Sequence, residues 1–110
     1  MTIIKDVNNV WKKGFFHNSQ FKMLWREDGN QSSTEAFIVK FEPGGFIPKH
    51  DHPGREYAYV LDGEMKVDGE TLKKGDFLTA GEGEIHDVST DTGVTFLIII
   101  EKPIHVVEEF

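Results

Sequence analysis

The sequence predicts an all-β domain, built as a β-sandwich or a β-barrel. Eleven glycines occur in the chain, and eight of them lie between Gly44 and Gly83, where they separate short apolar runs. Strands that recur roughly every 8–12 residues between turn signals are typical of these two architectures. The same stretch shows no helical periodicity. A length of 110 residues supplies one domain.

The first expected strands are runs rich in β-branched and aromatic residues. Phe21–Trp25 is the expected strand of the N-terminal region. Glu35–Phe41 stops at the turn residues Pro43–Gly45, and Tyr57–Leu61 stops at Asp62-Gly63. We therefore expect the chain to turn at both of these stops.

A hairpin is expected at Asp68-Gly69, the dipeptide preferred in two-residue type I′ turns. Its register would place Met65 opposite Leu72. Three further strands follow, each bounded by turn residues, and the last is the most apolar run of the chain: Phe77–Ala80, His86–Ser89 and Val94–Ile100.

Composition and charge exclude several classes of function. The formal net charge of −7 repels phosphate backbones and anionic lipid headgroups, so we expect neither nucleic acid nor membrane as a partner. Val94–Ile100 is far shorter than the ~20 residues that cross a bilayer, and the first residues lack a signal-peptide core. We expect a cytoplasmic protein. The absence of cysteine excludes thiolate and iron–sulfur sites.

Three of the five histidines lie near turns of the glycine-rich half, and they form a candidate metal site with one glutamate. In an extended chain His50 and His52 share a face, with Asp51 opposed. Glu56 would point inward, and His86 comes from a later strand. Imidazole and carboxylate ligands suit one divalent ion of Fe, Mn, Zn, Ni or Co, and four of them leave up to two positions open on an octahedral ion.

The residues around these ligands resemble the two motifs of the cupin superfamily. Residues Gly44–Glu56, followed by Gly63, match the first motif in every defined position and spacing. Residues Gly75–His86 match the second motif, with both glycines and the histidine in place. Gly81 stands where proline is usual, and Thr90 where asparagine is usual. The short segment between the motifs resembles the small cupin domains of anti-sigma factors and small metal-dependent dioxygenases.

The resemblance implies a single-domain cupin, a double-stranded β-helix or jelly-roll barrel. Residues 35–110 would form the barrel, and residues 1–34 would form N-terminal strands or an arm that covers it. The resemblance also implies that the metal ligands lie inside the barrel: His50, His52, Glu56 and His86. Glu56 is in addition a candidate general base, because a carboxylate beside a metal can ligate it or accept a proton.

Other residues that can carry chemistry have simpler interpretations. His17 and His105 match neither motif and are expected to be structural or exposed. Asp87 follows a ligand but should face the opposite way. Arg26 and Arg55 could anchor a carboxylate substrate, but exposed arginines are the better prediction.

Aromatic residues turned away from the barrel point to a further contact: Trp11, Trp25, Tyr57 and Tyr59. Such side chains need cover, either from the N-terminal strand or from another subunit. Because cupins commonly pair through sheet faces, the resemblance favours a homodimer. The interior is expected to be lined by Phe37, Val39, Leu78, Phe96 and Ile98.

Three functions remain open at this point. The first is a metal-dependent enzyme, an Fe(II)-type dioxygenase acting on a small oxygen-rich molecule that chelates the open metal positions. The second is a non-catalytic module that senses or binds a metal or a small ligand. The third, metal-free sugar epimerisation or carbohydrate binding, is disfavoured because it leaves four intact ligand positions unexplained.

Overall fold

The computed structural model describes residues 1–27 and 33–107, and it confirms the all-β prediction. Within these ranges the chain forms strands and a single 3-10 turn, η1 (Asp6–Asn8), and no helix is long and apolar enough to cross a membrane. The strands are β1 (Lys12–Lys13), β2 (Ser19–Arg26), β3 (Glu35–Phe41), β4 (Phe46–Asp51), β5 (Glu56–Val67), β6 (Glu70–Lys73), β7 (Phe77–Ala80), β8 (His86–Ser89), β9 (Val94–Ile100) and β10 (His105–Val106).

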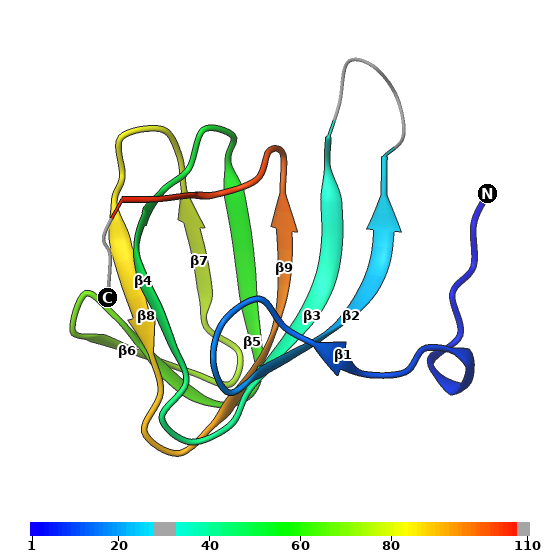
Figure 1. The fold of residues 1–110 in the computed structure, drawn as a ribbon, viewed down its shortest axis with the longest axis horizontal. Coiled ribbons are helices and arrows are strands. Elements are labelled where there is room, and N and C mark those ends of the chain that lie inside the picture. The colour runs from blue at the N-terminus through cyan, green and yellow to red at the C-terminus, as the bar shows by residue number, and fades with distance from the viewer. Residues whose placement is uncertain (28–32, 108–110) are drawn as a thin grey trace.

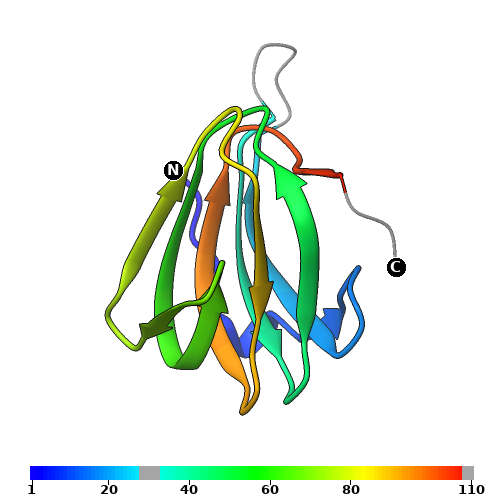
Figure 2. The ribbon, with the colours of Figure 1, turned by 90° about the vertical axis from the view of Figure 1, so that its left-hand side faces the viewer.

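The strands pair antiparallel in the order β1-β2-β3-β9-β5-β8-β4-β10, and β6 and β7 both pair with β5. Strand β5 connects the two halves of the sheet. Its first half pairs with β9 and β7, and its second half pairs with β6 and β8. Figures 1 and 2 show the resulting curled sheet, whose two halves face one another around an interior.

The hairpin predicted at Asp68-Gly69 is confirmed. Met65 lies opposite Leu72, as expected. Both turn residues have positive φ, 48° for Asp68 and 84° for Gly69, which is the requirement of a type I′ turn.

The turn predicted at Asp62-Gly63 is wrong, because β5 runs without reversal from Glu56 to Val67. The register against β9 shifts between Val60 and Asp62, and Gly63 has a φ of 75°. A residue with positive φ beside a register shift marks a β-bulge, which bends and twists a strand. Gly63 therefore marks a bulge and not a turn. At this bulge β5 crosses from one half of the sheet to the other.

The N-terminal strand is longer than predicted. The expected Phe21–Trp25 is part of β2, which pairs with β3 over its whole length apart from one register shift between Met23 and Trp25. Strand β1 covers only the first part of the outer edge of β2 through Lys12 and Lys13. The hairpin between β1 and β2 lies across one end of the barrel.

Alternation along the strands separates core from surface. Strand β9 alternates strictly between buried and half-buried residues, with Phe96 and Ile98 in the core. The predicted interior residues Phe37, Val39 and Leu78 are half-buried and pack against that core. Strand β5 buries its inward residues and leaves Tyr57, Tyr59 and Leu61 on the outer face, as its alternation predicts.

The two departures from the cupin motifs have local structural roles. Thr90 is buried, and its hydroxyl donates to the carbonyl of Glu64 at 2.7 Å and accepts from the N–H of Gly93 at 2.9 Å. Gly81 lies beneath Arg55, and a Cβ built there would come within 2.7 Å of the guanidinium Nη2. A side chain at position 81 would therefore displace Arg55.

Candidate metal centre

The four predicted ligands converge inside the barrel from three neighbouring segments. His50 lies near the end of β4, His52 just beyond it, Glu56 begins β5 and His86 begins β8. Strands β4 and β8 place His50 directly opposite His86. The four residues are 1%, 0%, 4% and 6% exposed, in chain order. Asp51 between the two histidines is half-buried, as its opposed orientation predicts.

The donor atoms of the four side chains all lie within 4.8 Å of one another. The three imidazole rings have centroids 4.5–4.8 Å apart. Glu56 Oε2 is 2.8 Å from His52 Nε2 and 4.0 Å from His50 Nε2. Two imidazoles therefore present Nε2 toward the same carboxylate oxygen.

Backbone carbonyls hold two of the imidazoles in orientation. His50 Nδ1 lies 2.8 Å from the carbonyl oxygen of Pro48, and His52 Nδ1 lies 2.8 Å from that of Glu84. A carbonyl only accepts, so each Nδ1 carries the proton and donates it. The lone pair of each imidazole is then on Nε2, which is the arrangement of metal-binding histidines.

Within residues 1–27 and 33–107, three buried nitrogen and oxygen atoms of the cluster have no hydrogen-bond partner: His52 Nε2, Glu56 Oε2 and His86 Nε2. With the proton of neutral His52 on Nδ1, its Nε2 carries no hydrogen, so the 2.8 Å contact with Glu56 Oε2 is not a hydrogen bond in that form. Burying polar atoms without partners is costly, and native structures rarely do it without a reason. A divalent cation would satisfy all three atoms, and their nitrogen and oxygen chemistry fits borderline or hard ions. This buried group could therefore hold a metal.

Burial shifts two of the three histidines toward the neutral form that a metal requires. Desolvation lowers the pKa of His50 and of His86 below the ordinary value, more than the nearby Glu56 carboxylate raises it. Burial also acts to lower the pKa of His52, but the adjacent Glu56 carboxylate outweighs it and raises this pKa. His52 is thus the imidazole of the cluster that holds a proton most readily.

Two groups that position the site were not predicted from the sequence. The carboxylate of Asp51 accepts from the N–H of His52 at 2.7 Å and from that of Gly83 at 2.8 Å, and these bonds lower the pKa of Asp51. The turn after β7 also supplies the carbonyl of Glu84 that holds the His52 ring. Backbone groups carry no sequence signal, so spacing alone could not reveal this clamp on the end of β4.

The remaining two histidines and Asp87 lie outside the cluster, as expected. His17 is exposed in the turn between β1 and β2, and His105 is exposed on β10. Asp87 is half-buried between the buried His86 and Val88, so it faces away from the cluster. The structure thus assigns none of these residues to the candidate centre.

Both candidate arginines are exposed, as predicted, and both have partners. Arg55 donates from Nη1 to the hydroxyl of Thr79 at 3.1 Å, on the outside of the barrel. Arg26 contacts Glu35 Oε2 at 2.8 Å from both Nε and Nη2. The carboxylate that Arg26 could recognise in a substrate is therefore supplied by the chain itself.

Similar folds occur in solved structures of low sequence identity. An RmlC-like cupin from Shewanella frigidimarina superposes with a TM-score of 0.77 at 20% identity, over 94% of this chain and 92% of that chain. An acetylacetone dioxygenase from Acinetobacter johnsonii superposes with a TM-score of 0.76 at 19% identity, over 99% of this chain and 78% of that chain. These likenesses establish the cupin fold that the motifs predicted.

A third match comes from the structure of Rhodobacter sphaeroides SigE in complex with the anti-sigma ChrR, with a TM-score of 0.71 at 19% identity, over 87% of this chain and 51% of that chain. Among curated proteins, none matches this sequence significantly. The family model described as the ChrR cupin-like domain matches residues 3–104. That range holds nearly the whole barrel and all four residues of the candidate centre. The chain therefore belongs to the family of ChrR cupin-like domains.

Proposed function

We propose that this chain is a metal-dependent enzyme of the dioxygenase type, acting on a small organic molecule with two adjacent or β-related oxygen atoms. Its ligands for one divalent ion are His50, His52, Glu56 and His86. The proposal depends most on one observation, the three buried donor atoms that meet without hydrogen-bond partners. The ion is Fe, Mn, Zn, Ni or Co, all of which accept this set of nitrogen and oxygen ligands.

The side chains of the centre have separate roles in this proposal. A divalent ion bound there supplies Lewis-acid or redox chemistry to the substrate oxygens. His50 and His52 are fixed by their Nδ1 bonds to Pro48 and Glu84, so their Nε2 atoms need no reorganisation. Glu56 would be a ligand in the resting state and, when a substrate displaces it from the ion, the base that accepts the proton this substrate loses on binding. The buried surroundings keep bulk water from competing for that carboxylate.

Oxygen uptake by the metal-loaded protein tests the enzyme directly. Diketones, catechols and hydroxyacids are the substrates to screen, because each can chelate a metal through two oxygens. We expect turnover that requires metal and that His50→Ala abolishes. His105→Ala is the matched control, because it removes an exposed histidine outside the cluster. Unchanged turnover in a folded His50→Ala protein would refute the proposed role.

A sensing module is the second candidate, and it is supported by the family match together with the SigE complex, in which ChrR is the anti-sigma. In that case the metal or a small ligand would change contacts with another protein without turnover. The same oxygen-uptake screen separates the two functions. A metal-loaded protein that binds a ligand stoichiometrically but consumes no oxygen with any compound of the screen would support sensing.

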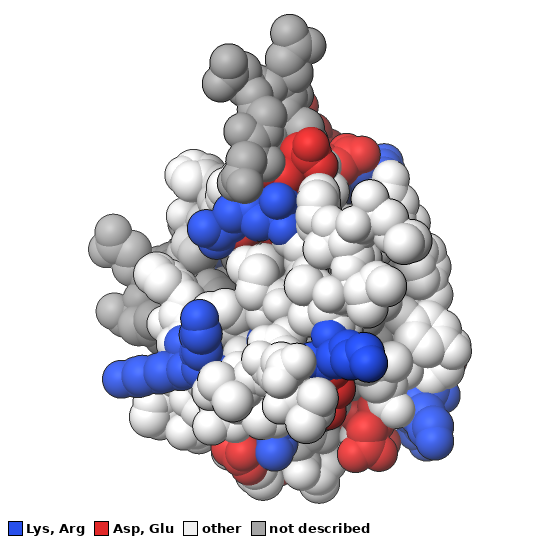
Figure 3. Space-filling view, turned by 90° about the vertical axis from the view of Figure 1, so that its right-hand side faces the viewer, with Lys and Arg blue, Asp and Glu red and all other residues white. Residues whose placement is uncertain are grey.

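The proposed assembly is a homodimer formed through the N-terminal side of the barrel. Residues 1–10 lie outside the barrel beyond β1 in Figure 1, where Asn9 Nδ2 donates to the carbonyl of Met23 and Asp6 pairs with Lys22, both at 2.8 Å. Ile3, Val7 and Val10 in this segment are exposed. The face shown in Figure 3 has uncharged side chains over most of its centre. Light scattering coupled to gel filtration tests this proposal: a monomer mass at micromolar concentration would refute it.

A further inference from the structure

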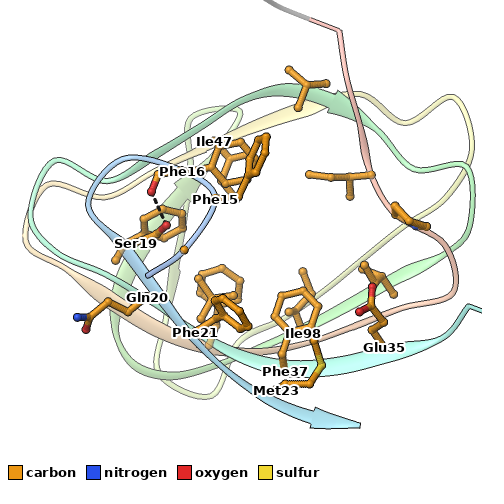
Figure 4. Close-up of a pocket in the computed structure, with 18 of the residues that line it drawn as sticks. Phe15, Phe16, Ser19, Gln20, Phe21, Met23, Glu35, Phe37, Ile47 and Ile98 are labelled. Atoms are coloured by element: carbon orange, nitrogen blue, oxygen red, sulfur yellow. Dashed lines mark hydrogen bonds between the residues drawn. The ribbon is translucent and has the colours of Figure 1, made fainter. Parts of the chain in front are cut away.

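A cavity of about 570 Å³ lies in the barrel beside the candidate metal centre. Its walls come from β2, β3, β4 and β9, from the turn between β1 and β2, and from the segment around β10. Figure 4 shows the lining side chains around an open centre, with Phe15, Phe16 and Ile47 on one side and Phe21, Met23 and Phe37 on the other. The volume lies within the range of about 300–1,000 Å³ that is usual for ligand sites.

The lining is aromatic and without net charge. It includes six phenylalanines, Phe15, Phe16, Phe21, Phe37, Phe41 and Phe96. Arg26 and Glu35 are its charged members, and they neutralise one another through the ion pair at 2.8 Å. Such walls favour a neutral apolar ring over a sugar or a polycarboxylate, whose polar groups would lose water without gaining partners.

The cavity adjoins the metal centre, although none of the four candidate ligands is among its lining residues. Ile100 of the cavity wall lies directly opposite Glu56 in the pairing of β9 with β5. Val106, also in the wall, lies opposite His50 in the pairing of β10 with β4. Directly paired residues have Cβ atoms about 4.5–5.5 Å apart. A ligand in the cavity is therefore one side chain away from two candidate metal ligands.

The rim of the cavity presents an aromatic ring to solvent. Phe15 is 91% exposed, and it packs edge-on against Phe16 at a centroid separation of 5.1 Å. The turn that carries both residues is held by the N–H of Gly14, which donates to the carbonyl of Ser19, and by the Ser19 hydroxyl, which donates to the carbonyl of Phe16. An exposed ring fixed at the mouth of an apolar cavity provides a surface that a ligand can cover.

We propose that this cavity receives a neutral, ring-bearing apolar portion of the substrate. Binding in the cavity does not require the metal. The role of this binding in catalysis rests on the proposed function, in which the oxygen atoms of the same molecule would lie toward Glu56 and His50. The substrate class is then an amphipathic molecule with an aromatic or alicyclic body and an oxygen-bearing end.

Naphthalene tests the cavity because it is neutral and has no atom that binds a metal. Metal-free protein is titrated with naphthalene and followed by ¹H–¹⁵N NMR. We expect saturable shifts at the amides of Phe15, Phe16 and Phe37. Absence of saturable binding, or shifts confined to the outer face around Phe77, would overturn the proposal.

Two variants and a control locate the binding. Met23→Trp adds bulk to the cavity wall and should weaken naphthalene binding by about tenfold or more, as expected when a ring is no longer buried. Phe15→Ala removes the exposed rim ring, with little risk to the fold, and should weaken binding by about threefold to tenfold. Phe77→Ala is the matched control, because it deletes an exposed phenylalanine outside the cavity and should change nothing. Equal affinities in all four proteins would overturn the assignment.

A pair of diketones connects the cavity to the metal centre. Acetylacetone and benzoylacetone carry the same chelating group, but benzoylacetone adds a phenyl ring. Metal-loaded protein should bind benzoylacetone about tenfold or more tightly than acetylacetone, and Met23→Trp should remove the preference by weakening benzoylacetone binding more than acetylacetone binding. Equal binding of the two would overturn the proposal. Naphthalene binding without binding of either diketone would leave the cavity standing and contradict the proposed function.

Discussion

His52 Nε2 lies 2.8 Å from Glu56 Oε2 in the interior of the barrel, where the two side chains are 0% and 5% exposed. The carboxylate raises the pKa of His52 against the effect of burial, whereas burial lowers the pKa of His50 and of His86. A metal ion bound by this cluster would therefore compete with a proton first at His52. This competition gives metal binding a defined dependence on pH.

Metal binding should release a proton from His52 at pH 6.5 and below, since ligands bind in the deprotonated form. Because the pKa of His52 is raised, this release declines as pH rises through that pKa. The lowered pKa values of His50 and His86 mean that their protons add to the release only at more acidic pH. Calorimetry in buffers of different ionisation enthalpy measures the number of protons released when the metal binds. Glu56→Gln should shift the release to lower pH, and a release independent of pH between 6 and 8 would contradict this assignment.

Metal removal should destabilise the fold. A metal at about 100 times its dissociation constant stabilises by about 2.7 kcal/mol, which corresponds to roughly 10 °C in Tm for a domain of this size. Scanning calorimetry of chelator-treated and metal-loaded protein measures the difference. The same comparison in His86→Ala should show almost no shift. A shift of equal size in that variant would place the stabilising ion elsewhere.

Asp51→Ala should weaken metal binding by about tenfold although Asp51 is no ligand, because it removes two charge-assisted hydrogen bonds that hold the backbone of His52 beside the site. Its carboxylate accepts the N–H groups of His52 and Gly83, and so ties the end of β4 to the turn beside the site. Asp87→Ala is the matched control, since Asp87 is also acidic and next to a ligand but faces away. Competition against a fluorescent zinc chelator measures both affinities, and equal losses would show that general charge matters instead of this clamp.

Two glycines with similar backbone angles should respond differently to alanine. Gly63 has a φ of 75° and Gly69 a φ of 84°, so each substitution incurs about 1–2 kcal/mol of left-handed strain. A Cβ at Gly69 would meet nothing within 4 Å, whereas one at Gly63 would clash with the carbonyl oxygen of Gly93. Gly63→Ala should therefore lower the free energy of unfolding by at least about 1 kcal/mol more than Gly69→Ala. Urea denaturation measures the free energy of unfolding of both variants. Equal losses of stability would contradict the structural role of the bulge at Gly63.

The parts of the fold that follow from local chemistry were predictable from the sequence. The Asp68-Gly69 turn is decided by two residues, so the opposition of Met65 and Leu72 followed from it. The shared face of His50 and His52 followed from alternation in an extended chain. The turn predicted at Asp62-Gly63 was wrong because a glycine with positive φ occurs in bulges as well as in turns. Only the pairing with the neighbouring strand distinguishes a bulge from a turn.

The non-local parts of the site were not predictable. The clamp on His52 uses a backbone carbonyl of Glu84, 32 positions away. The cavity wall combines Phe15 from the first turn with Ile104 near the other end of the chain. Neither spacing nor composition says that these segments meet. Motif matching therefore located the candidate metal ligands, but the shape of the adjoining cavity required the fold.

The central claim is that His50, His52, Glu56 and His86 hold one divalent ion. Elemental analysis of untagged protein, purified without chelator or immobilised nickel and then offered Fe(II), Mn, Co, Ni and Zn separately, tests it most directly. We expect about one ion per chain in the wild type and in His105→Ala, and almost none in His86→Ala. A wild-type protein that retains none of the five metals, or a folded His86→Ala protein that retains a full equivalent, would contradict the account.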